Sequence, residues 1–404
     1  MGCSASKSKD PRSNRNRPTN IGDVSVYVPG IRIPKTVDFL ESLGTSLPMK
    51  IIECLSAMRT HIVVMAGQED SMMTRTRRKN ATQHGGSIRV DLQKALENYL
   101  PVFLGLPRDG SHLHHKVQFC WTNQEDEAEE TTISNAWYEV LSVLHLMAIL
   151  LLSQANYMLL PRRSAHDYPP KVSDQNKRAS IDIFLKAAGY LDCSVRQVLP
   201  QLPVEVRFAK KHTGNLKSVV AFYQVLQRNV AYPHFRQQLP VDLSEGVLRA
   251  LCSQALGQAA EIQLGMAIDS SKATLAVKRR LACEIIKYWQ QARDNLVNLP
   301  STNGWGEKHH LFVKWKHLEA KAAAYYYHGM ILDEVNTEKS HGLASASLQA
   351  AEEYLKESKK VMEVFHTTPP SSSSPPLWGT MKYLSEKIPK DASSKGHRVC
   401  THAA

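Results

Sequence analysis

The sequence predicts an all-α fold, built as an elongated solenoid of stacked helical hairpins. Apolar side chains recur at steps of three and four along two long segments, 248–296 and 311–365, and turn-forming residues divide each segment. Many positions on these apolar faces are Ala or Gly, whose small size lets helix backbones approach closely. Helical hairpins stacked in this way form a scaffold rather than a catalytic cleft.

The later hairpin, 311–365, shows the pattern most clearly. Asn336-Thr337 and His341-Gly342 are turn-forming pairs between its two helices. The two apolar stripes comprise Leu311, Trp315, Leu318, Ala322, Tyr326 and Gly329, and then Ala344, Leu348, Ala351, Leu355, Met362 and Phe365.

The earlier hairpin, 248–296, repeats this arrangement with a turn and helix cap at Asp269–Ser271. Its stripes comprise Leu248, Leu251, Ala255, Ala259, Ile262 and Met266, and then Val277, Leu281, Ile285, Tyr288, Ala292 and Leu296. The two hairpins lie about sixty residues apart, roughly twice the tetratricopeptide period of ~34 residues. A tetratricopeptide-like core is therefore predicted.

The apolar run Val140–Leu152 predicts a buried core helix. It is shorter than the ~20 apolar residues that a membrane-spanning helix needs, and it contains His145. With 43% apolar residues, the 404-residue chain can bury a large core, and one elongated helical domain fits better than two or three compact ones. Seven scattered cysteines without a Cys-x-x-Cys pair indicate neither a disulfide framework nor a zinc site, which is typical of the reducing cytoplasm.

The N-terminus, residues 1–20, predicts a disordered basic tail with an acylation motif. Met1–Lys7 fits the myristoylation pattern, so that Gly2 would carry a myristoyl chain and Cys3 a palmitoyl chain. The basic residues Lys7, Lys9, Arg12, Arg15 and Arg17 face only Asp10, and they account for +4 of the net charge of +12. Two acyl chains, or one chain with a basic patch, hold a protein stably at an anionic membrane surface. The alternative is a basic tail that is never acylated.

No set of residues indicates an enzyme, a metal or a cofactor. The phosphate-binding, dinucleotide-binding, zinc-protease and serine-hydrolase motifs are absent, as are the kinase motifs His-Arg-Asp and Asp-Phe-Gly. The histidine groups His112, His114 and His115, and His309 and His310, are interpreted as exposed side chains rather than metal ligands. Tyr325–Tyr327 point in three directions on a helix and do not form a stacking surface for nucleic acid. Neither a nucleic acid nor a small-molecule substrate is expected.

Several segments resemble the BRO domain of Alix-type and BROX-type proteins, most closely a plant-like BROX-type one. Leu251–Glu261 is similar to the family's LAQAQE helix, and Lys186–Leu191 to its AAGIFKHLKE helix. Ala322–Gly329 with Ser347–Tyr354 resembles the YHG…SLQEAE hairpin, and Phe119–Thr122 before an acidic stretch also fits. These matches follow the family's order over about residues 90–365. The resemblance implies a boomerang-shaped helical domain.

In this family the domain receives an amphipathic helix from the C-terminus of an ESCRT-III subunit. The resemblance places the groove for that helix on two segments of this chain, with Leu191, Val195 and Leu199 on one and Leu248, Leu251 and Ala255 on the other. Leu191 is the preferred contact. The alternative is that these are core residues, and for Leu251 and Ala255 both interpretations are equally open because they lie on the main apolar stripe.

The resemblance weakens at the C-terminus. A Pro/Ser-rich linker follows residue 366, and Cys400 misses the prenylation pattern of BROX-type members by one place. The predicted organisation is therefore a tail at 1–20, a BRO-type helical domain at 21–366, and a linker with a short C-terminal tail at 367–404, for which a truncated form is one interpretation. The predicted function is a non-catalytic adaptor, cytoplasmic and peripherally anchored to endosomal or plasma membranes. The alternative is a basic helical-repeat protein that binds anionic lipid or RNA through its charge.

Overall fold

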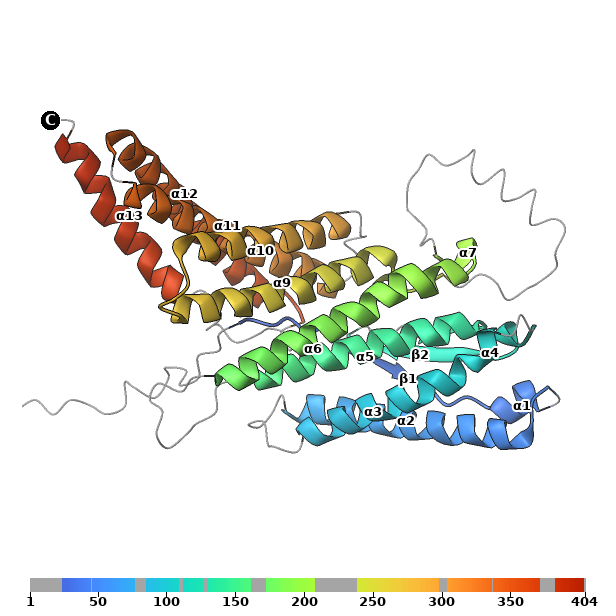
Figure 1. Cartoon of the computed structure of the whole chain (residues 1–404). Helices are drawn as coiled ribbons and strands as arrows, with labels where there is room; N and C mark the ends of the chain where they lie inside the picture. The colour runs from blue at the N-terminus through green and yellow to red at the C-terminus, as the bar shows by residue number, and fades with distance from the viewer. Residues whose placement is uncertain are drawn as a thin grey trace, which may run out of the picture.

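Helices dominate the computed structural model, which describes residues 24–44, 46–76, 85–108, 112–125, 130–160, 172–207, 238–297, 304–335, 337–370 and 382–402 (Figure 1). The helices are α1 (Phe39–Leu43), α2 (Met49–Thr76), α3 (Gly85–Phe103), α4 (Gly105–Arg108), α5 (Ala136–Met158), α6 (Asp174–Cys193), α7 (Val204–Arg207), α9 (Glu245–Asp269), α10 (Leu275–Leu296), α11 (Gly304–Glu334), α12 (Glu338–Thr367) and α13 (Lys382–His402). Short helical turns lie at His112–His115, Ser194–Val198, Leu199–Gln201 and Val241–Leu243.

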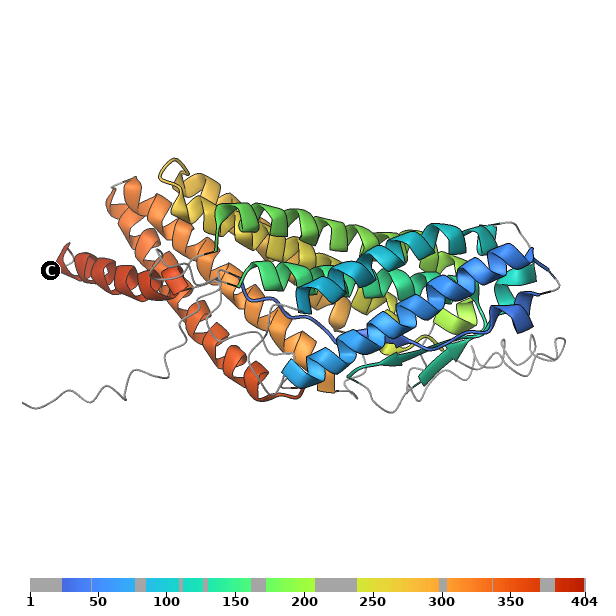
Figure 2. The same ribbon diagram turned by 90° about the horizontal axis from the view of Figure 1, so that it is seen from below.

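The long helices pack against one another in chain order. Each of α2, α3, α5, α6, α9, α10, α11 and α12 contacts the next long helix along the chain. Together they form an elongated stack that bends where α11, α12 and α13 depart from the direction of α5 and α6 (Figures 1 and 2). The predicted all-α solenoid is confirmed.

Polar caps set where most of these helices begin. Asn135, Ser173, Ser244, Thr274 and Thr337 each accept a backbone N–H of the first helical turn through a side-chain oxygen. Thr337 also receives a reciprocal bond, because the Ser340 hydroxyl accepts its backbone N–H. Two predicted breaks differ from these positions.

The cap of α10 is Thr274 rather than a residue of the predicted turn at Asp269–Ser271. His341-Gly342 lies inside α12, because the capping box at Thr337 starts the helix before that pair. The turn between α11 and α12 is therefore shorter than the sequence pattern indicated.

A small antiparallel sheet, which the sequence analysis did not predict, lies beside α5. Its order is β1 (Arg32–Pro34), β2 (Phe119–Asn123) and β3 (Glu130–Ile133). The inward-facing side chains Phe119 and Trp121 of β2 are fully buried. The sheet thus covers one side of the core helix α5.

Helix α5 lies within the stack. In the described part of the chain it is the one helix long and apolar enough to cross a membrane, yet 94% of its most apolar window is buried by other elements. It packs as the core helix that the sequence predicted.

The core divides into two hydrophobic clusters that meet along α9. The first surrounds α5, and the second lies between α9, α10, α11 and α12. The N-terminal segment 24–28 runs between them, with Val24 and Val26 in the first cluster and Tyr27 in the second. Gln254 of α9 donates to the Tyr27 carbonyl oxygen at 2.8 Å, and Gln258 donates to that of Ser25 at 3.1 Å. These bonds satisfy backbone oxygens that burial would otherwise leave without a hydrogen-bond partner.

The C-terminal helix α13 belongs to this core. Leu384, Ile388 and Ala392 are buried in the second cluster, and the Tyr326 hydroxyl donates to an Asp391 carboxylate oxygen at 2.8 Å. The helix begins at Lys382. It lies beyond the predicted domain boundary at 366, where the sequence showed a linker but not the surface of the second cluster that α13 covers.

The close approach of α11 and α12 depends on Gly329. A Cβ atom at this position would lie 2.9 Å from Leu348 Cγ and 3.1 Å from the Ala344 carbonyl oxygen. We expect Gly329→Ala to destabilise the protein by about 1–2 kcal/mol, since overpacking outweighs the gain of up to ~1 kcal/mol in helix propensity. Gly265→Ala on α9 is the control, because a Cβ atom there would meet nothing within 4 Å. This substitution should stabilise the protein by about 0.5–1 kcal/mol through helix propensity. Urea unfolding of both variants measures the difference, and equal effects would contradict the close packing.

Two imidazoles make stability sensitive to acid. Burial lowers the pKa of His145 to about 4 and that of His309 to about 3. Between pH 6.5 and pH 4 the unfolded chain therefore binds more protons than the folded one, so stability falls as pH falls. Each imidazole contributes up to ~1.4 kcal/mol per pH unit. We expect thermal unfolding temperatures to drop between pH 7 and pH 5.5, and His145→Asn to flatten that slope; an unchanged slope would contradict the assignment.

Candidate functional site

The six residues predicted to line the partner groove are all buried. Their exposed fractions lie between 0% and 6%, for Leu191, Val195, Leu199, Leu248, Leu251 and Ala255. All six belong to the first core cluster. A buried side chain offers no surface to a partner helix. In this structure the six residues are core residues, as in the alternative interpretation given above. On these helices, the more exposed neighbours of the six residues are the side chains that a partner could reach.

Those neighbours lie along the outer side of the junction between α6 and α9. Leu185 of α6 is 49% exposed, and Cys252 and Leu256 of α9 are half-buried against the first core cluster. The two helices run antiparallel, since Cys252 Sγ donates to the Ala188 carbonyl oxygen at 3.5 Å while Lys177 meets Asp269 at 3.0 Å. This register brings Leu185 level with Leu256.

A small residue lies beside Leu185 on the same face of α6. Gly189 is exposed one turn further along α6, and a Cβ atom there would meet nothing within 4 Å. Leu185, Gly189, Cys252 and Leu256 together form an apolar surface that we call the α6/α9 strip.

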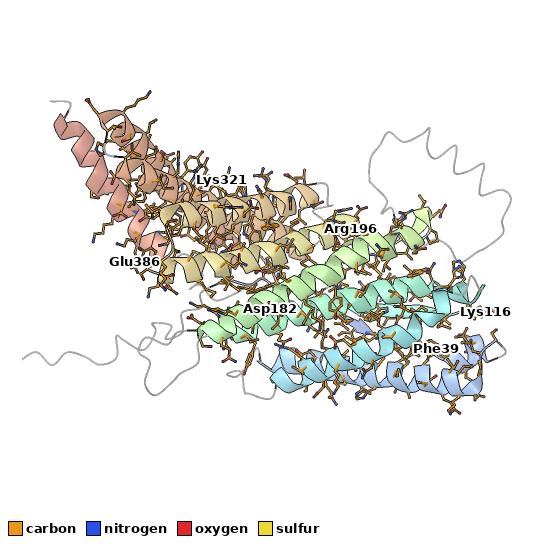
Figure 3. The ribbon with its side chains drawn as sticks, in the orientation of Figure 1. Phe39, Lys116, Asp182, Arg196, Lys321 and Glu386 are labelled. Carbon is orange, nitrogen blue, oxygen red and sulfur yellow. The ribbon has the colours of Figure 1, made fainter. Side chains whose placement is uncertain are left out.

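Two charged pairs lie at one end of the strip. Arg196 meets Asp192 and Arg249 meets Glu245, each at 2.8 Å, and Figure 3 shows Arg196 at that end of α6 and α9. Exposed pairs of this kind contribute little to stability and remain available to a partner. Burial, with a smaller contribution from Asp192, raises the pKa of the Cys252 thiol to about 11, so the middle of the strip is uncharged at neutral pH.

A buried ion pair fixes where α9 begins. The Arg32 guanidinium donates to both carboxylate oxygens of Asp242, at 2.9 and 2.8 Å, and to the Tyr138 hydroxyl at 3.0 Å. Asn123 of β2 donates to the same carboxylate at 2.9 Å. Because Asp242 lies three residues before α9, this network ties the start of that helix to the sheet and to α5.

A second buried network holds the other side of α5. The Glu139 carboxylate accepts from Arg59, from the Trp121 indole at 2.8 Å and from the Tyr99 hydroxyl at 3.2 Å. The Arg59 guanidinium also lies 4.9 Å from the centre of the Trp121 ring. Every partner comes from a different element, so this network ties α2, α3 and β2 to α5.

Other predicted site residues have different outcomes. Gly2, Cys3, Lys7, Lys9, Arg12, Arg15 and Arg17 lie outside the described residues. His309 was predicted to be exposed, but it is buried and its Nε2 pairs with Gln254 Oε1 at 2.9 Å, because the ring stacks on Tyr27 in the second core cluster. Among the described residues, no group of three or more His, Cys, Asp or Glu side chains could hold a metal ion.

The sequence analysis missed Leu185, Gly189 and Leu256. A signal for Leu185 existed, since it is an apolar residue on the polar side of α6, between buried Phe184 and exposed Lys186. No sequence signal identified Leu256, because its exposure depends on which side of α9 its neighbours leave uncovered.

The family model for the BRO1-like domain matches residues 106–393. This chain belongs to the BRO1-like domain family. The predicted family is confirmed, and the match extends past residue 366 into α13. No curated protein sequence matches the chain.

Two solved structures share the BRO1-like fold with this chain. One is ALIX in complex with the SIVmac239 PYKEVTEDL late domain, at 15% identity and a TM-score of 0.59, covering 92% of this chain and 44% of the ALIX chain. The other is the ALIX BRO1 CHMP4C complex, at 14% identity and a TM-score of 0.57, covering 92% of this chain and 87% of that chain. The protein thus spans less than half of the longer ALIX chain. At these identities the similarity is one of fold.

Proposed function

We propose that this protein is a membrane-associated adaptor whose BRO1-like domain binds the C-terminal amphipathic helix of an ESCRT-III subunit. The family supports this role, and one of the similar structures is a BRO1 domain in complex with CHMP4C. The proposed role is one of binding rather than catalysis. Through this binding, the protein would connect the membrane to which it is attached with the ESCRT-III subunits that remodel membranes.

The observation that carries the proposal is the α6/α9 strip. Leu185 is 49% exposed on α6, level with half-buried Leu256 and one turn from exposed Gly189. An amphipathic helix binds such a surface by inserting apolar side chains spaced three and four residues apart. Each buried leucine-sized side chain contributes about 1.5–3 kcal/mol before the costs of association. The exposed charges of Arg196 and Arg249 would then orient the guest along the strip.

A binding measurement with the full-length protein tests this proposal. A labelled peptide of an ESCRT-III C-terminal helix is titrated with the protein, and fluorescence anisotropy is recorded. Saturable binding is expected, and a peptide with the same composition but a scrambled apolar pattern should not bind. Absence of binding to the C-terminal helix, or equal binding of the scrambled peptide, would contradict the proposal.

Membrane attachment is the second component of the proposal. Gly2 and Cys3 are proposed to carry a myristoyl and a palmitoyl chain, which would anchor the protein on the cytoplasmic face of endosomal or plasma membranes. One myristoyl chain binds only marginally, at about 10⁴ M⁻¹, whereas a second chain or a basic segment makes attachment stable. Mass spectrometry of the N-terminal peptide from cells tests this directly. If Gly2 is found unmodified, the proposed lipid anchor is contradicted.

A further inference from the structure

Helix α13 occupies a groove on the second core cluster. Its buried side chains Leu384, Ile388 and Ala392 follow one another at steps of four, and the helix lies against α12. The Tyr326 hydroxyl of α11 donates to Asp391, one position before the last of these residues. We call the surface beneath the four α13 side chains the α13 groove.

Part of the α13 groove is a polar cavity rather than a packed core. Leu384 is the α13 residue that lines a cavity of about 40 Å³ between α9, α10 and α11, which is large enough for a few water molecules. Glu261, Lys316 and Glu319 also line it, and the Lys316 ammonium lies 3.2 Å from the Glu261 carboxylate and 2.5 Å from that of Glu319. Because buried charges favour water beside them, Leu384 gains less from burial here than against an apolar wall.

Other features also weaken the attachment of α13. Pro389 lies inside the helix and has no N–H to donate to the carbonyl of residue 385, so one internal hydrogen bond is missing. Along residues 382–394, whose side chains the structure describes, one hydrogen bond joins α13 to the rest of the protein and no ion pair does.

One polar group beside α13 is left unsatisfied. The Tyr327 hydroxyl of α11 is buried near Tyr383 of α13, and it has no hydrogen-bond partner among the residues that the structure describes. A buried hydroxyl without a partner destabilises the packed state relative to an open one, in which water can reach it. With few buried apolar contacts, an element of this kind opens before the whole protein unfolds.

We propose that the α13 groove is a second helix-docking site, and that α13 is a detachable helix that fills it until a partner helix takes its place. The seated helix shows what the groove accepts: two branched aliphatic side chains four residues apart, a small residue four positions later, and a carboxylate for Tyr326. A partner helix with this pattern and no internal proline would form the same contacts with every internal hydrogen bond in place. Figure 3 shows Glu386 of α13 well separated from Arg196, so this site is distinct from the α6/α9 strip and does not rest on the proposed function.

Native-state hydrogen exchange of the full-length wild-type protein tests whether α13 detaches. The amides of α13 should exchange on the order of 100-fold faster than those at the centres of α9 and α11, because opening of α13 does not require global unfolding. Pro389→Ala restores an N–H to the helix and should slow exchange in α13 by about tenfold or more, with no change in α9. Equal protection of α13 and α11 in the wild type would overturn the proposal.

Peptide binding tests whether the groove accepts a helix from another molecule. The probe is a labelled peptide of the α13 sequence carrying Pro389→Ala, titrated against the full-length protein and followed by fluorescence anisotropy. The double variant Leu384→Asp, Ile388→Asp detaches α13 and should bind the probe about tenfold or more tightly than the wild type, in which the tethered α13 competes at a high effective concentration. The matched control Ser393→Asp, Ser394→Asp adds the same charge at exposed positions of α13 and should bind like the wild type.

Four results with these proteins would overturn the proposal. They are equal binding of the probe by the wild type and the detached variant, binding by neither, loss of the circular dichroism of the whole domain in the detached variant, and a wild-type dimer in light scattering. The third would show that the fold requires α13, and the fourth that a second copy exchanges α13 and fills the groove. The ESCRT-III peptide should bind the wild type and the detached variant equally, so the two proposals can fail independently.

Discussion

The substitution Leu185→Asp should weaken binding of an ESCRT-III C-terminal helix on the order of 30-fold without changing the stability of the fold. Leu185 is 49% exposed, so the aspartate remains solvated in the free protein. In the complex the carboxylate would be buried against apolar side chains of the guest, which costs at least the ~2 kcal/mol gained by burying the leucine. Fluorescence anisotropy measures the affinity, and thermal unfolding measures the stability.

Two further variants make this result specific. Val64→Asp on α2 is the matched control, because Val64 is 51% exposed and lies away from the strip. Leu191→Asp is expected to unfold the protein, because Leu191 is fully buried, so lost binding in that variant would not report on the partner surface. Binding by Leu185→Asp equal to that of Val64→Asp would contradict the assignment.

Removal of the Asp242 carboxylate has the largest expected effect on stability. Asp242→Ala should destabilise the protein by about 3–5 kcal/mol, because it leaves the Arg32 guanidinium buried without its counter-charge. Asn123 and the start of α9 lose a partner in the same step. Urea unfolding followed by circular dichroism measures the change.

A double variant distinguishes an unpaired charge from lost packing. Arg32→Met with Asp242→Leu removes both charges and keeps most of the volume, and such replacements are often close to neutral. The double variant should therefore be more stable than Asp242→Ala alone. If Asp242→Ala costs less than ~1 kcal/mol, or if the double variant is the less stable of the two, the ion pair does not hold α9 in place.

The helical hairpins could be predicted from the sequence because helix periodicity is a local property. The stripes of α9 to α12 were found from steps of three and four alone, and most of their members are buried. The sheet could not be found in this way, since strands of 3, 5 and 4 residues are too short to show alternation. The packing of helix α13 was not predicted, because its polar sequence and internal Pro389 conceal the three apolar residues that join the second core cluster.

The six residues predicted for the partner groove lie on the buried sides of their helices, whereas the proposed strip lies on the exposed side of α6 and α9. An apolar stripe identifies the buried face of a helix, and Leu191 and Leu251 follow that rule. The exposed strip depends instead on how α6 and α9 register against each other, which is fixed by contacts such as Ala188 with Cys252. The Arg32–Asp242 pair joins residues 210 positions apart and has no local signal either.

Site-specific photo-crosslinking tests most directly whether the α6/α9 strip receives the partner helix. A photoreactive phenylalanine analogue is placed at position 185 in one protein and at position 64 in another, since the native side chains are equally exposed at 49% and 51%. Each protein is irradiated with the labelled ESCRT-III C-terminal helix at a saturating concentration. Crosslinks from position 185, and not from position 64, are the predicted result. Crosslinks from position 64 alone, or from neither position while the peptide is bound, would contradict the account.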